Sequence, residues 1–215
     1  GRIPGRLERV RLGGEGRNLA GPAVFVDYAH TPDALDNVLT TLKGLPHRRL
    51  ICVFGCGGDR DRGKRAQMGA IAVRHADVVL ITSDNPRTER PESILEEIIH
   101  GVEVSGGHLQ TLATLFCGPQ PKSGYAVVSN RHQAIAAACS LAAPGDSVLI
   151  AGKGHEQYQI VWTRKEFFAD QQEAMNGLVH WNERHLLAAT GGQRMAGSQQ
   201  TVLQDISTDT RTLRP

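Results

Sequence analysis

Short continuous apolar runs, separated by amphipathic stretches, are the feature that most constrains the fold of this chain. A strand that is apolar on both faces is covered on both faces, as in a parallel sheet. Alternation of such runs with helical patterns predicts right-handed strand–helix–strand units. The predicted strands span residues 23–26, 50–54, 78–81, 125–128 and 147–150. The expected fold class is therefore α/β, with a Rossmann-like, mostly parallel sheet flanked by helices.

The helical patterns lie between these runs, at residues 31–42, 64–76, 91–100, 131–142 and about 170–182. In the first, Thr31 is placed to cap the helix and Pro32 occupies its first turn. Residues 101–123 contain Gly106-Gly107 and two further prolines, and we expect an irregular or short hairpin excursion there. Residues 158–162 are expected to form a further strand that closes the domain with the last helix.

The amino-acid composition changes after about Glu183, where glycine, serine and glutamine become frequent. We expect one domain over residues 1–183, and a linker with the truncated start of a following domain over residues 184–215. The chain opens at Gly1 without a methionine, so we also expect it to be cut from a larger protein.

Charge and cysteine content exclude several classes of function. The 24 basic and 22 acidic residues are interleaved, which argues against a nucleic-acid partner. No apolar run approaches the roughly 20 residues of a membrane span, so we expect no membrane insertion and a cytoplasmic protein. The four cysteines show no zinc-ligand spacing, and Cys52 and Cys139 lie in apolar patterns typical of core residues. We therefore expect no metal site in this chain.

A polar turn follows the third predicted strand. It places Asp84, Asn85 and Arg87 together, with Pro86 holding Asn85 out of helical geometry. Ligands bind outside the carboxyl ends of strands in open α/β sheets. An arginine fork suits a carboxylate and an aspartate suits an ammonium, so the turn suits an amino acid. The alternative is a helix-capping turn with a solvated arginine.

The glycine-rich loop at residues 55–65 resembles two nucleotide motifs and matches neither. It lacks the third glycine of a dinucleotide fingerprint, and Arg65 stands where a phosphate loop needs Ser or Thr. It presents Arg60 and backbone N–H groups to an anion, or it is a salt-bridged tight turn. Two further loops, at residues 27–33 and 151–156, follow strands, so all four should meet at one edge of the sheet.

Five ordered motifs carry a resemblance to a known family. They are Pro4-Gly5-Arg6-Leu7-Glu8, Asp27-Tyr28-Ala29-His30-Thr31-Pro32-Asp33-Ala34, Phe54-Gly55-Cys56-Gly57-Gly58-Asp59-Arg60-Asp61, Asp84-Asn85-Pro86-Arg87 and Gly152-Lys153-Gly154-His155-Glu156. Together they resemble the C-terminal domain of the Mur ligases, in particular members that add meso-diaminopimelate. They extend over about 165 residues.

The resemblance implies an ATP-dependent amide ligase of peptidoglycan biosynthesis. ATP would phosphorylate the D-Glu carboxylate of UDP-MurNAc-L-Ala-D-Glu, and the amine of meso-diaminopimelate would attack that acyl phosphate. By the resemblance, the amino-acid site comprises Arg60, Asp84, Asn85, Arg87, Gly152 and Glu156, and the nucleotide side comprises Arg6, Asp27 and His30. The phosphate loop and the Mg²⁺ ligands of the family belong to a central domain. This chain should therefore contain no catalytic residue and should be inactive alone.

The tail carries a second, shorter resemblance. Residues 203–215 resemble the opening of the UDP-binding domain of a Mur ligase, which suggests a fused D-alanyl-D-alanine-adding enzyme. Other interpretations of the main domain are a lysine-adding or folylpolyglutamate-type ligase, and a non-catalytic amino-acid-binding module.

Overall fold

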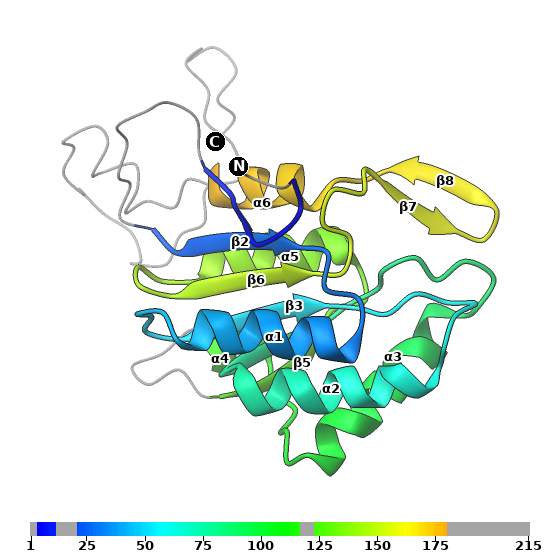
Figure 1. Ribbon diagram of the computed structural model, residues 1–215, viewed down its shortest axis with the longest axis horizontal. Coiled ribbons are helices and arrows are strands. Elements are labelled where there is room, and N and C mark those ends of the chain that lie inside the picture. The colour runs from blue at the N-terminus through cyan, green and yellow to red at the C-terminus, as the bar shows by residue number, and fades with distance from the viewer. Residues whose placement is uncertain (1–3, 12–20, 117–122, 180–215) are drawn as a thin grey trace, which may run out of the picture.

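A six-stranded sheet with helices on both faces forms the centre of the molecule (Figure 1). The computed structural model describes residues 4–11, 21–116 and 123–179. The strand order is β1-β2-β6-β3-β4-β5, in which β1 is antiparallel to β2 and the other neighbours are parallel. The strands are β1 (Glu8–Arg9), β2 (Ala23–Asp27), β3 (Leu50–Phe54), β4 (Val78–Ile81), β5 (Gly124–Val127) and β6 (Ser147–Ala151). The predicted α/β class and the five predicted parallel strands are confirmed.

The helices divide between the two faces of the sheet, each over its own apolar cluster. One face carries α1 (Pro32–Lys43), α2 (Gly63–His75) and α3 (Pro91–Val104); the other carries α4 (Leu112–Phe116), α5 (Arg131–Leu141) and α6 (Asp170–Val179). The central strands β3, β4 and β6 are buried along their whole length, as continuous apolar runs predict. Helix α1 begins as predicted, since the Thr31 side chain accepts the N–H of Ala34 at 3.3 Å.

The prediction of an irregular excursion over residues 101–123 is wrong in part. Helix α3 continues to Val104 and α4 occupies Leu112–Phe116, while residues 117–122 lie outside the described part of the chain. The helical pattern predicted a helix end at residue 100, but Gly101 lies inside α3, where its backbone packs directly on α2. Gly101 lies where α3 is in close contact with α2.

The closing strand is also different from its prediction. β7 (Tyr158–Val161) does not join the main sheet but pairs with β8 (Arg164–Phe167) as a separate antiparallel hairpin (Figure 1). The side chains of β8 are all exposed, so the sequence has no apolar run there to indicate a strand. Trp162 lies in the connecting turn with φ of 56°. The last helix is described only to Val179, so its predicted end at about residue 182 lies outside the described residues.

Three cysteines are buried and free: Cys52, Cys56 and Cys139. Burial raises the pKa of each thiol to about 12, so these groups stay neutral. The prediction that Cys52 and Cys139 are small core residues is confirmed. Cys117 lies outside the described residues.

Helices α2 and α3 cross at two glycines. A Cβ at Gly101 would lie 1.9 Å from the carbonyl oxygen of Ala66, and a Cβ at Gly69 would lie 2.4 Å from that of Ile98. Neither clash is with the end of a flexible side chain. The helices can approach this closely only because these positions lack a side chain.

We predict that Gly101→Ala lowers the free energy of unfolding by about 2 kcal/mol, because overpacking exceeds the roughly 1 kcal/mol that alanine gains in helix propensity. Urea denaturation measures this. Gly44→Ala is the matched control, since a Cβ there would lie 3.5 Å from its nearest atom, and it should change stability by less than about 0.5 kcal/mol. Equal stability of Gly101→Ala and the unsubstituted chain would contradict the close helix contact.

Candidate functional site

The turn after β4 is built as a buried polar loop. Asp84 and Asn85 are 7% and 6% exposed. The turn caps no helix, because α3 begins at Pro91 with Arg90 as its N-cap. Arg87 has φ of 51°, and its backbone pairs with the hairpin: its N–H donates to Ile160 O at 3.2 Å and its O accepts from Trp162 N at 2.8 Å. The helix-capping interpretation is therefore wrong.

The residue that ties this turn to the loop after β6 is Lys153, which is fully buried. Its Nζ lies 3.0 Å from Asp84 Oδ1 and donates to Asn85 Oδ1 at 2.8 Å and Tyr158 O at 2.9 Å. Burial lowers the pKa of Lys153, and the Asp84 carboxylate opposes that change. The sequence prediction missed this residue. The only signal for it was a lysine between two glycines directly after a buried strand.

Lys153 lies between Gly152 and Gly154, and these glycines allow its loop to pack closely against Asp84 and Tyr28. Gly152 has φ of 122°, and a Cβ on it would lie 2.9 Å from Asp84 Oδ2. Gly154 has φ of 54°, and a Cβ on it would lie 2.7 Å from Tyr28 Cβ. Any other residue at these two positions would be strained and would push the loops apart.

Three loops therefore converge at the carboxyl edge of the sheet. Asn85 Nδ2 donates to Glu156 Oε2 at 3.3 Å, and Arg87 Nη1 donates to Gly58 O at 2.6 Å. The N–H of Gly58 donates in turn to Asn85 O at 2.9 Å. Five of the six predicted amino-acid-site residues are thus brought together: Asp84, Asn85, Arg87, Gly152 and Glu156.

Arg60 is the sixth, and it lies at the edge of that cluster: a Cβ on Gly57 would lie 2.9 Å from Arg87 Nη1 and 3.9 Å from Arg60 Cγ. It is exposed, and its Nη1 donates to the carbonyl of its neighbour Asp59 at 3.1 Å. The rest of its loop has the features of a salt-bridged turn: Asp59 accepts from the N–H of Thr88 at 3.1 Å, and the buried Arg65 pairs with Glu89 at 2.8 Å. The hydrogen bond from Arg65 lowers the pKa of Glu89 to about 2.

The predicted nucleotide-side residues form a second group, around Tyr28. The guanidinium of Arg6 lies 5.5 Å from the Tyr28 ring, and the His30 ring lies 4.5 Å from it. His155 lies 5.6 Å away on the same ring, a contact that the sequence prediction did not include. Such a cation and ring cluster can stack on a planar base.

Asp27 takes a structural part in that group. Its Oδ2 accepts the N–H of Leu7 at 2.6 Å and its Oδ1 accepts that of Ala29 at 2.8 Å. The carboxylate therefore holds the N-terminal segment against β2. Gly152 N–H also donates to Asp27 O at 3.0 Å, which joins this group to the amino-acid loop.

A buried ion pair lies beneath the loops. Arg131 and Asp170 are both fully buried in their side chains and lie 2.7 Å apart. Burial would lower the pKa of Arg131, but Asp170 outweighs it and holds the pKa above its ordinary value. Arg131 Nη2 also donates to Ala151 O at 3.0 Å, at the end of β6. The pair fixes α5 and α6 under the point where the Gly152 loop begins.

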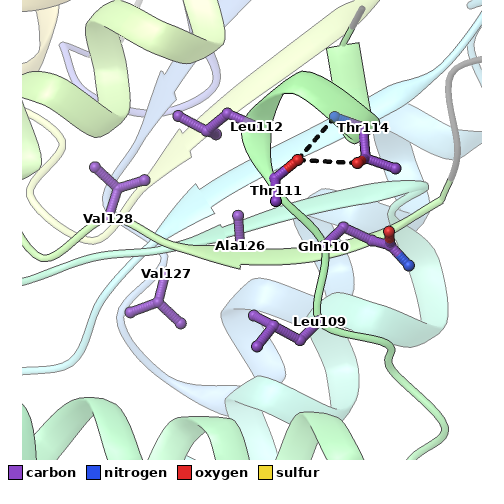
Figure 2. A pocket seen from close by; sticks show the side chains of 8 residues that line it. All are labelled: Leu109, Gln110, Thr111, Leu112, Thr114, Ala126, Val127 and Val128. Carbon is purple, nitrogen blue, oxygen red and sulfur yellow. Dashed lines mark hydrogen bonds between the residues drawn. The ribbon is translucent and has the colours of Figure 1, made fainter.

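A shallow hollow lies elsewhere, along the edge strand β5, and it contains none of the predicted site residues (Figure 2). Figure 2 shows apolar side chains, Gln110 and the bonded pair Thr111 and Thr114 around it. Since no charged side chain among the described residues lines it, the hollow offers nothing that would recognise a charged ligand.

Within residues 4–11, 21–116 and 123–179, no group of three or more His, Cys, Asp or Glu side chains is arranged to hold a metal ion. No helix in that part of the chain has the length and apolar character to cross a membrane.

Comparison with known proteins identifies relatives of this domain. Residues 5–154 match the family described as Mur ligase, glutamate ligase domain. A UDP-N-acetylmuramoyl-L-alanyl-D-glutamate–2,6-diaminopimelate ligase of Thermosynechococcus vestitus is 51% identical over 82% of this chain and 31% of its own length. The enzyme of the same name from Geobacter metallireducens is 51% identical over 80% of this chain and 32% of its own length.

A solved structure gives the same result. It is described as a UDP-N-acetylmuramoyl-L-alanyl-D-glutamate–2,6-diaminopimelate ligase, and it is 40% identical over 82% of this chain and 31% of its own, with a TM-score of 0.67. The chain thus spans about a third of the length of the relatives it matches. The chain belongs to the Mur ligase family, through its glutamate ligase domain.

Proposed function

We propose that this chain is the amino-acid-binding C-terminal domain of an ATP-dependent ligase that adds meso-diaminopimelate to UDP-MurNAc-L-Ala-D-Glu in peptidoglycan biosynthesis. The observation that carries the proposal is the convergence of Asp84, Asn85, Arg87 and Glu156 from two loops at the carboxyl edge of the sheet. The names of the relatives support the same substrates.

Diaminopimelate has a distal amino-acid centre that carries an ammonium and a carboxylate, and the side chains of the site complement both. Glu156 and the Oδ2 side of Asp84 are acceptors for an ammonium. Arg87 and Asn85 Nδ2 are donors for a carboxylate. A lysine substrate would leave these donors without a partner, so we favour diaminopimelate over a lysine-adding ligase. The relatives are named as ligases, which favours a ligase domain over a non-catalytic amino-acid-binding module.

The role of this domain in the reaction is to bind and orient. Arg87 and Glu156 would hold the distal centre and leave the other amine of diaminopimelate to attack the acyl phosphate. Arg6, His30 and the Tyr28 ring would contact the nucleotide, with Asp27 holding the segment of Arg6 in place. Arg60 is exposed at the edge of the site, where its guanidinium would be open to an anionic group of the ligand. We assign ATP phosphates and Mg²⁺ to the central domain of the ligase.

We predict that the complete ligase releases ADP only when both meso-diaminopimelate and UDP-MurNAc-L-Ala-D-Glu are present, whereas residues 1–215 alone release none. The reason is that the glycine-rich loop has Arg65 in place of the metal-binding hydroxyl of a phosphate loop, and Arg65 is buried in ion pairs. A coupled ADP assay measures both. ADP release by residues 1–215, or a complete protein that binds diaminopimelate without turnover, would contradict the proposal.

We predict that Arg87→Ala in the complete ligase lowers kcat/KM for diaminopimelate by about 30- to 4,000-fold, because loss of one partner of a buried charge pair costs about 2–5 kcal/mol. The KM for ATP should change less than about threefold. Arg90→Ala is the matched control, since the Arg90 side chain is 77% exposed and forms a 3.9 Å surface pair. Steady-state kinetics with diaminopimelate and with lysine decide the matter. An equal decrease in kcat/KM for the two amino acids would show that Arg87 does not bind the distal carboxylate.

We propose further that residues 1–183 form this domain and that residues 184–215 lead into the N-terminal domain of a fused D-alanyl-D-alanine-adding ligase. Residues from 180 onward lie outside the described residues, so the support is the resemblance of residues 203–215 alone. The parent gene tests the fusion directly. We predict that its reading frame continues past codon 215 into a second Gly-Lys-Thr phosphate loop; a stop codon or an unrelated domain there would contradict it.

A further inference from the structure

Lys153 is a buried cation with oxygen atoms around its ammonium. Its side chain is 0% exposed, and its Nζ lies within 3.0 Å of oxygens from Asp84, Asn85 and Tyr158. Those oxygens belong to the turn after β4 and to the first residue of the hairpin. A lysine is almost never fully buried unless its charge is balanced. The position therefore has a specific requirement for a positive donor.

Lys153 and the backbone N–H of Ile160 together determine which way the Asn85 amide points. Asn85 Oδ1 accepts from Lys153 Nζ at 2.8 Å and from the backbone N–H of Ile160 at 2.9 Å. An ammonium and a backbone N–H can only donate, so the carbonyl oxygen of the amide must face them. The Nδ2 group then faces Glu156 and the convergence of the loops, where it can only donate.

Lys153 also balances the charge of Asp84. This carboxylate is 7% exposed, and burial of a charged group is costly unless the charge is paired. Arg131 is the other cation whose charge acts on Asp84, and it is already paired with Asp170 at 2.7 Å. Lys153 is therefore the cation paired directly with Asp84 Oδ1, and this contact fixes the carboxylate that would accept from a ligand ammonium.

We infer that Lys153 is a positioning residue for amino-acid recognition: it pairs with Asp84 and holds the oxygen of the Asn85 amide, so that the amide donor faces the ligand, without touching the ligand itself. The inference rests on the proposed function of the site. On this inference, the specificity of the site depends on Lys153, a buried residue behind the groups that would contact the ligand. The competing account is a purely structural tie between the hairpin and the turn through Tyr158 O.

The test is Lys153→Met in the complete ligase. Removing the ammonium takes away the ion-pair partner of Asp84 Oδ1, the donor to Tyr158 O and one of the two donors to Asn85 Oδ1. We therefore expect the KM for meso-diaminopimelate to rise about 10- to 100-fold. The KM values for ATP and for UDP-MurNAc-L-Ala-D-Glu, and kcat, should stay within about threefold. The control is Lys165→Met, an exposed lysine of the hairpin, which should leave all of these constants unchanged. A purely structural tie would alter every constant together.

A double-mutant cycle with Asp84→Asn separates the two accounts. If Lys153 acts through Asp84, Lys153→Met in the Asp84→Asn background should raise the KM for diaminopimelate by less than about threefold. An undiminished effect there would overturn the inference. If Lys153→Met does not fold, Lys153→Gln keeps a donor for Asn85 and is judged by the same cycle.

The outcomes distinguish the inference from the proposed function. An unsubstituted ligase that shows no diaminopimelate-dependent ADP release rejects the proposed function and the inference together. An active unsubstituted ligase whose Lys153→Met variant keeps the original KM for diaminopimelate rejects the inference alone.

Discussion

The buried contact between Lys153 and the pair Asp84 and Asn85 is the interaction on which the site depends. It joins two loops that are 68 residues apart in the sequence but follow strands two places apart in the sheet. The hairpin depends on it as well, because Asn85 and Arg87 supply the backbone and side-chain partners of Ile160 and Trp162. One lysine thus holds the turn, the hairpin and the glycine loop in a single arrangement.

Paired buried charges recur throughout this edge of the molecule. Arg131 pairs with Asp170, Arg65 with Glu89, and Lys153 with Asp84. Such pairs contribute little net stability, because desolvation offsets most of their attraction, whereas loss of one partner costs about 3–5 kcal/mol. Their effect here is on geometry: Arg131 and Asp170 join the first residues of α5 and α6, Arg65 joins α2 to the segment before α3, and Lys153 joins two loops. These pairs hold donors and acceptors in place at the edge where a ligand would bind.

The sequence predicted the parallel sheet and the meeting of loops at one edge, since continuous apolar runs and strand ends are local signals. It could not predict Lys153, because a lysine after a strand is ordinarily exposed and only the tertiary fold brings three oxygens around it. It missed β8 because an exposed strand has no apolar pattern. It grouped Arg60 with the site from its motif, while the structure leaves that flexible side chain in solvent.

The central claim is that the site presents the carboxylate of Asp84 and the amide donor of Asn85 to an amino acid, both held in place by Lys153. A crystal structure of the complete ligase with meso-diaminopimelate tests it most directly. We expect the distal carboxylate about 3 Å from Asn85 Nδ2 and the Arg87 guanidinium, with Lys153 still paired with Asp84. A ligand carboxylate bound by Lys153 itself, or an Asn85 amide that turns its oxygen to the ligand, would contradict the account.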